Sequence, residues 1–229
     1  WGIRKTTESL VGMFAFAVFD RKTRTLSLVR DRVGIKPVYW THQNGAFVFG
    51  SEIKALLASE RIEAKRDPSA LAAYLQFAYI PAPATIYHNI QKLPPGTILA
   101  LRKDQEPELE TYWDIAQIAR TGQGNPVSLA DPEVGVQLER LLAQAVTDRM
   151  ISDVPLGAWL SGGLDSSLVV ALMQANSTRK VRTFSIGFPA FGYDEADDAR
   201  RIAAHLGTDH EEFQVSPQDA MDVISAMPA

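Results

Sequence analysis

The sequence predicts a mixed fold in two parts, an α+β part followed by an α/β part built on a parallel sheet. Residues 14–101 contain β-rich runs joined by turns, with short helical patterns between them. From about residue 133, helical patterns alternate with short apolar strands. Such alternation is typical of a parallel sheet wound with right-handed crossovers. A glycine- and serine-rich turn at residues 161–167 joins one of these strands to a helix.

The first part is predicted to begin with two hairpins. Runs at residues 14–19 and 25–29 flank a polar turn. Runs at 38–40 and 46–49 flank Gln43-Asn44-Gly45, a strong turn signal. The remaining elements expected here are a short helix with Ser51 as its N-cap, a helix from about Ser69 with Leu71, Tyr74, Leu75 and Ala78 on one face, and a strand at residues 97–101.

Residues 116–132 contain few apolar side chains and several glycines, which predicts a linker between domains at 1–115 and 133–229. Three strands are few for a parallel sheet, so we expect the second domain to be incomplete. Its expected elements are a helix to about residue 150, strand 155–160, helix 166–174, strand 181–188, helix 194–206, strand 211–215 and a last helix from Pro217.

The composition excludes several classes of protein. The chain has 229 residues, of which 46% are hydrophobic and 22% charged, as in soluble globular proteins. A net charge of −4 without a block of lysine or arginine argues against a nucleic-acid partner. No apolar run is long enough to span a membrane, and no signal peptide is visible. The absence of cysteine excludes disulfides and thiolate metal sites and agrees with a cytoplasmic location.

The turn between strand and helix has the chemistry of a phosphate-binding loop. Glycine permits positive φ and close approach of the backbone to a ligand. The first N–H groups of a helix have no internal partner and favour an anion, and serine hydroxyls add donors. A carboxylate beside phosphates needs a bridging cation, which predicts Mg²⁺ at Asp165. The loop consists of Ser161, Gly162, Gly163, Leu164, Asp165, Ser166 and Ser167.

Other glycine-rich motifs do not fit this loop. A Walker loop requires a lysine that is absent here, and the dinucleotide fingerprint G-x-G-x-x-G is also absent. A serine-hydrolase elbow would need glycine where Trp159 stands. An ordinary strand-to-helix turn with serine caps remains the alternative.

The loop resembles the pyrophosphate loop of the ATP-pyrophosphatase superfamily. Three upstream blocks, Gly12–Ala17, Arg30–Tyr39 and Gly50–Leu56, resemble the distal part of a class II glutamine amidotransferase domain. In this order the blocks resemble glutamine-hydrolysing asparagine synthetases over nearly the whole chain. The resemblance implies the distal part of an N-terminal-nucleophile glutaminase sandwich, followed by the first part of an ATP-pyrophosphatase domain, both incomplete.

The resemblance also implies a reaction. ATP would place its phosphates on the loop, Mg²⁺ at Asp165 and its adenine at Leu160 and Ile186, with Gly187 beside it. Aspartate would be converted to asparagine through a β-aspartyl-adenylate, with ammonia from glutamine and release of AMP and pyrophosphate. Plain core packing is an equal alternative for the side chains of Leu160 and Ile186.

No catalytic residue is assigned. The glutaminase nucleophile of the family is an N-terminal cysteine, and residue 1 here is Trp1 in a chain without cysteine. We therefore expect a fragment that is inactive alone. A relative on the same scaffold, such as a β-lactam synthetase or lasso-peptide cyclase, and a non-catalytic remnant remain alternatives. The expected partners are ATP, aspartate and glutamine, and a homodimer of the full-length protein is left open.

Other polar and aromatic clusters have simpler interpretations. Acidic residues at 194–198 are expected to cap a helix, with Asp194 as N-cap, rather than to bind metal. The charged turn at 30–36 is expected to form a solvated ion pair. His205 and His210 receive no catalytic role. The aromatic residues expected in a core or an interface are Trp40, Trp113 and Trp159.

Overall fold

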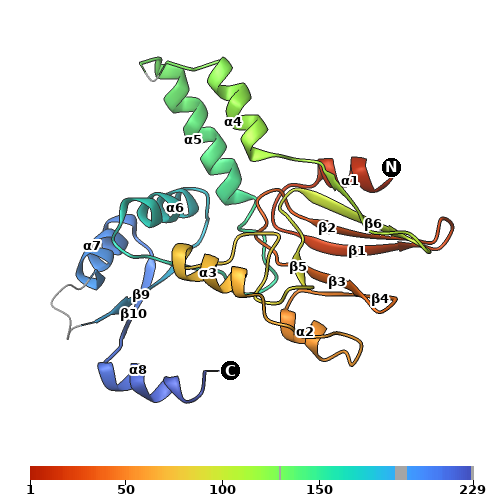
Figure 1. The fold of residues 1–229 in the computed structure, drawn as a ribbon. Helices are drawn as coiled ribbons and strands as arrows, with labels where there is room; N and C mark the ends of the chain where they lie inside the picture. The colour runs from red at the N-terminus through yellow and green to blue at the C-terminus, as the bar shows by residue number, and fades with distance from the viewer. Residues whose placement is uncertain (129, 189–194, 228–229) are drawn as a thin grey trace. The chain divides into compact units, whose positions relative to one another are not determined.

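The protein was analysed as a computed structural model, which describes residues 1–128, 130–188 and 195–227 (Figure 1). Its internal contacts divide the chain into two compact units, Trp1–Pro126 and Val127–Ala229, which are described separately here. Within the described ranges, no helix is both long and apolar enough to cross a membrane.

The first unit contains two antiparallel sheets. The larger sheet has the strand order β1-β2-β6-β7, and the smaller one has the order β4-β3-β5. The strands are β1 (Ala15–Asp20), β2 (Thr25–Arg30), β3 (Tyr39–Gln43), β4 (Ala46–Gly50), β5 (Gln91–Lys92), β6 (Thr97–Arg102) and β7 (Glu108–Thr111). The helices are α1 (Ile3–Ser9), α2 (Ile53–Leu57), α3 (Pro68–Phe77) and α4 (Ile115–Gly124).

Both sheets of the first unit contribute to one hydrophobic core. Leu28 of β2 and Leu99 of β6 are buried in the same cluster as Trp40 of β3. Val38 and Leu93, which flank the strands of the smaller sheet, complete this cluster. Side chains alternate between the faces of a strand, so each sheet can bury one face in this core.

The two predicted hairpins are confirmed. β1 pairs with β2, and β3 pairs with β4, both antiparallel. Asn44 and Gly45, between β3 and β4, have φ values of 50° and 71°. Two successive positive φ values are what a type I′ hairpin turn requires. The short elements α1, β5 and β7 were not predicted, because too few residues carry their patterns.

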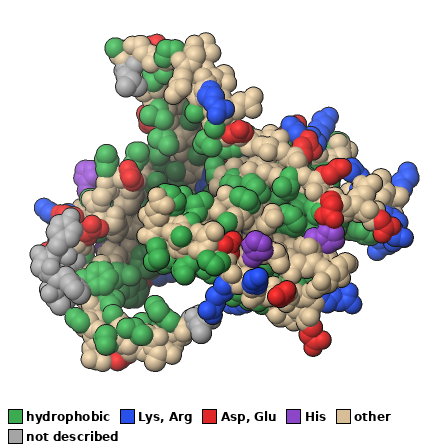
Figure 2. Space-filling model, viewed as in Figure 1, with side chains coloured by type: hydrophobic (Ala, Val, Ile, Leu, Met, Phe, Trp, Pro, Cys, Tyr) green, Lys and Arg blue, Asp and Glu red, His purple; other side chains and the backbone are tan. Residues whose placement is uncertain are grey.

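One expectation about the helices of the first unit is wrong, whereas the helix expected from about Ser69 is confirmed as α3, which begins at Pro68. The N-cap of α2 is Glu52 rather than Ser51, and it makes no side-chain capping bond. The N-cap of α3 is Asp67, whose carboxylate accepts the Ser69 N–H at 2.8 Å. Large apolar side chains along α3 lie at the surface in Figure 2 rather than in a core; those more than one third exposed are Leu71, Tyr74, Leu75 and Phe77.

The charged turn after β2 is organised around a buried carboxylate, which corrects the expected solvated ion pair. Asp31 is 0% exposed, and its carboxylate accepts the N–H groups of Ile35 and Lys36 at 3.0 and 2.9 Å. The Arg30 guanidinium donates to the carbonyls of Gly34, Lys36 and Leu93. Burial raises the pKa of the Asp31 carboxyl, but its backbone N–H partners outweigh this and hold the pKa below the ordinary value.

The second unit contains a three-stranded sheet of order β10-β9-β8, in which neighbouring strands are parallel. Its strands are β8 (Gly157–Trp159), β9 (Arg182–Gly187) and β10 (Asp209–Gln214). Its helices are α5 (Pro132–Thr147), α6 (Leu164–Ala175), α7 (Ala196–Leu206) and α8 (Pro217–Ile224). Leu160, Val170 of α6, and Ala199 and Ala203 of α7 form one buried cluster.

The segment predicted as a linker, residues 116–132, is largely helical at its start. Helix α4 occupies most of residues 116–132, and its N-cap Asp114 accepts the N–H groups of Ala116 and Gln117. The domain boundaries at residues 115 and 133, the glutaminase sandwich and the ATP-pyrophosphatase sheet stay predictions. The expected N-cap Asp194 lies outside the described residues, and α7 has Glu195 as an N-cap without a side-chain bond.

Candidate functional site

The 161–167 loop leaves the carboxyl end of β8 and enters α6. The Leu160 N–H donates to the Phe184 carbonyl at 2.8 Å, so the pairing of β8 with β9 continues up to the first residue of the loop. Helix α6 begins at Leu164, two residues before the predicted start, and Gly163 is its N-cap. Asp165 therefore lies in the first helical turn, where the helix dipole favours a negative charge. The predicted order of strand, loop and helix is confirmed.

The two glycines of the loop are not equivalent. Gly162 has a φ of +71°, and a Cβ placed there would lie 2.8 Å from Asp198 Cβ and 3.1 Å from Ala199 N. Only glycine fits both this backbone conformation and this approach to the start of α7. Gly163 has an ordinary φ of −78°, and its nearest contact would be Ser161 Oγ at 3.4 Å. The close packing of the loop on α7 therefore depends on Gly162.

The loop serines hydrogen-bond to the loop itself. Ser167 Oγ donates to the Gly163 carbonyl at 2.6 Å, and Ser166 Oγ donates to the same carbonyl at 3.2 Å. Ser166 Oγ lies 3.0 Å from Ser161 Oγ and accepts the Ser161 N–H at 3.3 Å. These bonds fix the shape of the turn. Donation from these hydroxyls to a phosphate stays a prediction.

A pocket of about 280 Å³, here called the loop pocket, adjoins the loop. It brings Ser161 and Ser166 together with Leu160 and Ile186, as predicted from the carboxyl ends of neighbouring strands. Gly162, Gly163, Leu164, Asp165, Ser167 and Gly187 are not among its lining residues. Four other lining residues were not predicted from the sequence: Trp159, Ser185, Glu195 and Ala196.

The two residues expected at the adenine differ in burial. Leu160 is 1% exposed and belongs to the core shared by α6 and α7, which favours core packing for its side chain. Ile186 is 39% exposed and is available to a ligand. Trp159 is 65% exposed in the pocket wall, so of the expected core or interface positions a core position is wrong for this tryptophan, and an interface position stays a prediction. The period-two pattern of β9 is the signal by which Ser185 could have been found.

The donor set at the loop suits a magnesium ion shared with phosphates. Asp165 offers one exposed carboxylate, and Mg²⁺ commonly binds one or two carboxylates together with substrate phosphates and water. Among the residues that the structure describes, no cluster of three or more His, Cys, Asp or Glu could hold a metal. A metal held by the protein alone is therefore not supported in that part of the chain.

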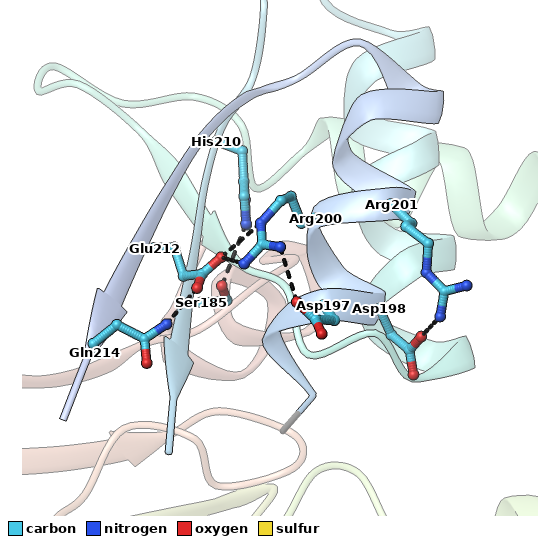
Figure 3. Close-up of polar contacts among 8 residues, drawn as sticks. All are labelled: Ser185, Asp197, Asp198, Arg200, Arg201, His210, Glu212 and Gln214. Carbon is cyan, nitrogen blue, oxygen red and sulfur yellow. Dashed lines mark hydrogen bonds and ion pairs between the residues drawn. The ribbon is translucent and has the colours of Figure 1, made fainter. Parts of the chain in front are cut away.

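The acidic residues at the start of α7 are engaged in ion pairs (Figure 3). Asp198 pairs with Arg201, and Asp197 pairs with Arg200 at 2.8 Å. Arg200 also pairs with Glu212 of β10 at 2.6 Å. Hydrogen bonding to Glu212, with a smaller contribution from Asp197, raises the pKa of Arg200. These contacts agree with a structural role for the acidic residues.

Comparison with known families defines the class of the chain. Residues 1–113 match the family described as glutamine amidotransferase domain, and residues 137–229 match the family described as asparagine synthase. A glutamine amidotransferase domain thus precedes an asparagine synthase domain in one chain. The chain belongs to the glutamine-hydrolysing asparagine synthetase family, a family of ligases.

Individual relatives agree with this assignment. Asparagine synthetase [glutamine-hydrolyzing] 1 of Bacillus subtilis is 32% identical over 95% of the chain and 33% of the relative. Putative asparagine synthetase [glutamine-hydrolyzing] 2 of Methanocaldococcus jannaschii is 36% identical over 93% of the chain and 41% of the relative. Amidase chyE of Penicillium rubens is 29% identical over 87% of the chain and 31% of the relative. The chain thus spans between 31% and 41% of the length of these relatives.

Proposed function

We propose that the protein amidates aspartate to asparagine, with ATP as the activating substrate and glutamine as the source of ammonia. The observation that carries the proposal is the 161–167 loop, which joins a parallel strand to a helix beside a pocket. The positive φ of Gly162 and the first N–H groups of α6 give the loop the features of an anion site. The names of the relatives supply asparagine as the product and glutamine as a substrate, and the family resemblance supplies ATP and aspartate.

A loop that holds the β- and γ-phosphates together makes pyrophosphate the leaving group. The side-chain carboxylate of aspartate then attacks the α-phosphorus, and the bond from this phosphorus to the pyrophosphate oxygen breaks. Ammonia attacks the resulting β-aspartyl-adenylate at its carbonyl carbon and expels AMP. A magnesium ion at Asp165 would neutralise charge on the departing pyrophosphate. The first-turn N–H groups of α6 would orient the same oxygens without reorganisation.

Binding of MgATP to Asp165 variants tests the role of the loop. We expect Asp165→Asn to weaken MgATP binding in calorimetric titrations and to abolish its dependence on Mg²⁺. Asp197→Asn, in the first turn of α7, is the matched control because Asp197 pairs with Arg200 and does not line the loop pocket. Equal MgATP binding by the wild type and Asp165→Asn would contradict the proposed magnesium site.

Pyrophosphate release tests the reaction itself. In the full-length protein, release from ATP should require aspartate, and asparagine should accumulate when glutamine is present. Release that is independent of aspartate would contradict the proposed substrate. The cytoplasmic location and the homodimer are further predictions that rest on the family alone.

A further inference from the structure

A chain of hydrogen bonds begins at Ser185 in the lining of the loop pocket and ends at a backbone carbonyl of α7. Ser185 Oγ lies 3.3 Å from His210 Nε2, the contact drawn in Figure 3. His210 Nδ1 lies 3.0 Å from Thr183 Oγ1, which lies 2.9 Å from Thr208 Oγ1. Thr208 Oγ1 donates to the Ala203 carbonyl at 3.4 Å. Side chains from two strands and the turn after α7 are thereby connected.

The carbonyl at the end of the chain supports one direction for the other bonds, whose donors the contacts among hydroxyls and imidazole leave open. A carbonyl only accepts, so Thr208 donates its single hydroxyl hydrogen to Ala203 in the contact at 3.4 Å. With that hydrogen engaged, Thr183 donates to Thr208, and its oxygen accepts a hydrogen from His210 Nδ1. A neutral imidazole protonated at Nδ1 has its lone pair on Nε2. The hydroxyl hydrogen of Ser185 is therefore directed at His210.

We propose that this chain of bonds presents the Ser185 oxygen to the bound nucleotide as a hydrogen-bond acceptor. The only hydrogen on Ser185 Oγ is engaged by His210, so what remains for a ligand is lone pairs. The group that fits is an N–H or O–H donor of the nucleotide, either the 6-amino group of adenine or a ribose hydroxyl. The inference deepens the proposed function and rests on it, because it takes the ligand of the loop pocket to be ATP.

The burial of Ser185 should make the site select nucleotides that carry the donor over analogues that lack it. Ser185 and Thr183 are both buried and lie on the same face of β9, whereas Ile186 between Ser185 and the strand end is exposed. A buried acceptor that loses its ligand donor is left unsatisfied, which penalises an analogue without the donor. His210 is a positioning residue in this scheme, because it acts on the nucleotide only through Ser185.

The tautomer of His210 tests the direction of the bonds without any ligand. In the full chain with ¹⁵N-labelled histidine, at about pH 8.5 where imidazole is generally neutral, we expect the proton on Nδ1. Thr183→Val removes the acceptor of this proton and should shift the population toward the Nε2 tautomer. His205→Gln is the control, because His205 is exposed on α7 and makes none of these contacts. A wild-type proton on Nε2 would overturn the assignment.

Nucleotide binding tests the role of Ser185. Calorimetry should show that Ser185→Ala binds ATP about five- to tenfold more weakly than the wild type, the usual value of one hydrogen bond. Ser185→Thr, which keeps the hydroxyl, should restore part of the affinity, and Thr183→Val should weaken binding although Ser185 is intact. Ser177→Ala, outside the loop pocket, should bind as the wild type does.

Nucleotide analogues identify the donor. ITP lacks the 6-amino group, and 2′-deoxy-ATP and 3′-deoxy-ATP each lack one ribose hydroxyl. The analogue that lacks the group donating to Ser185 should bind the wild type and Ser185→Ala with equal affinity. The other two analogues should still bind the wild type more tightly than Ser185→Ala. If the wild type does not bind ATP, the proposed function fails; if it binds ATP and Ser185→Ala binds equally well, only the present inference fails.

Discussion

Single residues decide the conformation of the 161–167 loop and of the turn after β2. Gly162 allows the loop to pass within contact distance of Asp198 and Ala199. Asp31 closes its own turn by accepting two backbone N–H groups from a fully buried position. At both places a small chemical change should have a large effect, because backbone atoms leave no room for adjustment.

Gly162→Ala is expected to destabilise the chain, whereas Gly163→Ala should be tolerated. Positive φ costs alanine about 1–2 kcal/mol, and crowding against α7 adds about 1–3 kcal/mol. Gly163 already has φ in the ordinary region, so it is the matched control. Urea unfolding measures the difference. Equal unfolding free energies for the two variants would show that the contact with α7 does not constrain the loop.

Asp31→Asn is expected to lower stability at about pH 7 by roughly 1.5–3 kcal/mol, the usual range for hydrogen bonds to a charged group. Because the pKa of Asp31 is lowered in the fold, its carboxylate stabilises the protein above the ordinary aspartate range. This contribution is lost as the pH falls through the lowered pKa. The difference in unfolding free energy between the wild type and Asp31→Asn should therefore become smaller in acid. Urea unfolding at a series of pH values measures this difference. A difference that widens in acid would contradict the assignment.

At the scale of elements, the residues at the carboxyl ends of the neighbouring strands β8 and β9 have different structural roles. The residue after β8, Leu160, is buried under α6 and α7. Near the end of β9, Ile186 is exposed and Ser185 faces the loop pocket. The end of β8 therefore contributes to the hydrophobic core, whereas the end of β9 provides side chains that a ligand in the loop pocket can contact.

Alanine substitution should separate these two tasks. Leu160→Ala should cost about 2–5 kcal/mol of unfolding free energy, because it removes a fully buried side chain. Ile186→Ala should change stability by no more than about 0.5–1 kcal/mol, yet weaken ATP binding. Thermal unfolding and calorimetry measure the two effects. Binding of ATP by Ile186→Ala with the same affinity as by the wild type would contradict the role of Ile186 in ligand contact.

The sequence predicted local features better than long-range ones. The hairpin turn at Asn44-Gly45 and the strand, loop and helix around Gly162 depend on neighbouring residues, and both were predicted. The contacts of half-buried Arg30 were not, because one of its partners is the carbonyl of Leu93, 63 residues away. The contact of Ser185 with His210 could not be predicted for the same reason, since His210 belongs to another strand.

At the scale of the whole molecule, the chain has two compact units that match two different families. It has no cysteine, and it spans between 31% and 41% of the length of the relatives named above. The part of the reaction that we propose for the described site is the binding of ATP and the release of pyrophosphate. Ammonia production by a thiol requires a residue that is absent from this sequence.

We therefore expect the 229-residue chain to make no asparagine from ATP, aspartate and glutamine. Amino-acid analysis after long incubation measures this directly, with the full-length protein as the positive control. Asparagine formed by the chain alone would show that its two units suffice for the reaction.

The central claim is that the 161–167 loop binds the phosphates of ATP. Titration of the ¹⁵N-labelled chain with MgATP, followed through its backbone amide signals, tests it most directly. If the loop binds MgATP, the signals of Gly162 to Ser167 and of the loop pocket residues Ser185 and Ile186 should shift and reach saturation. Unchanged signals in the loop, with or without shifts elsewhere in the chain, would contradict it.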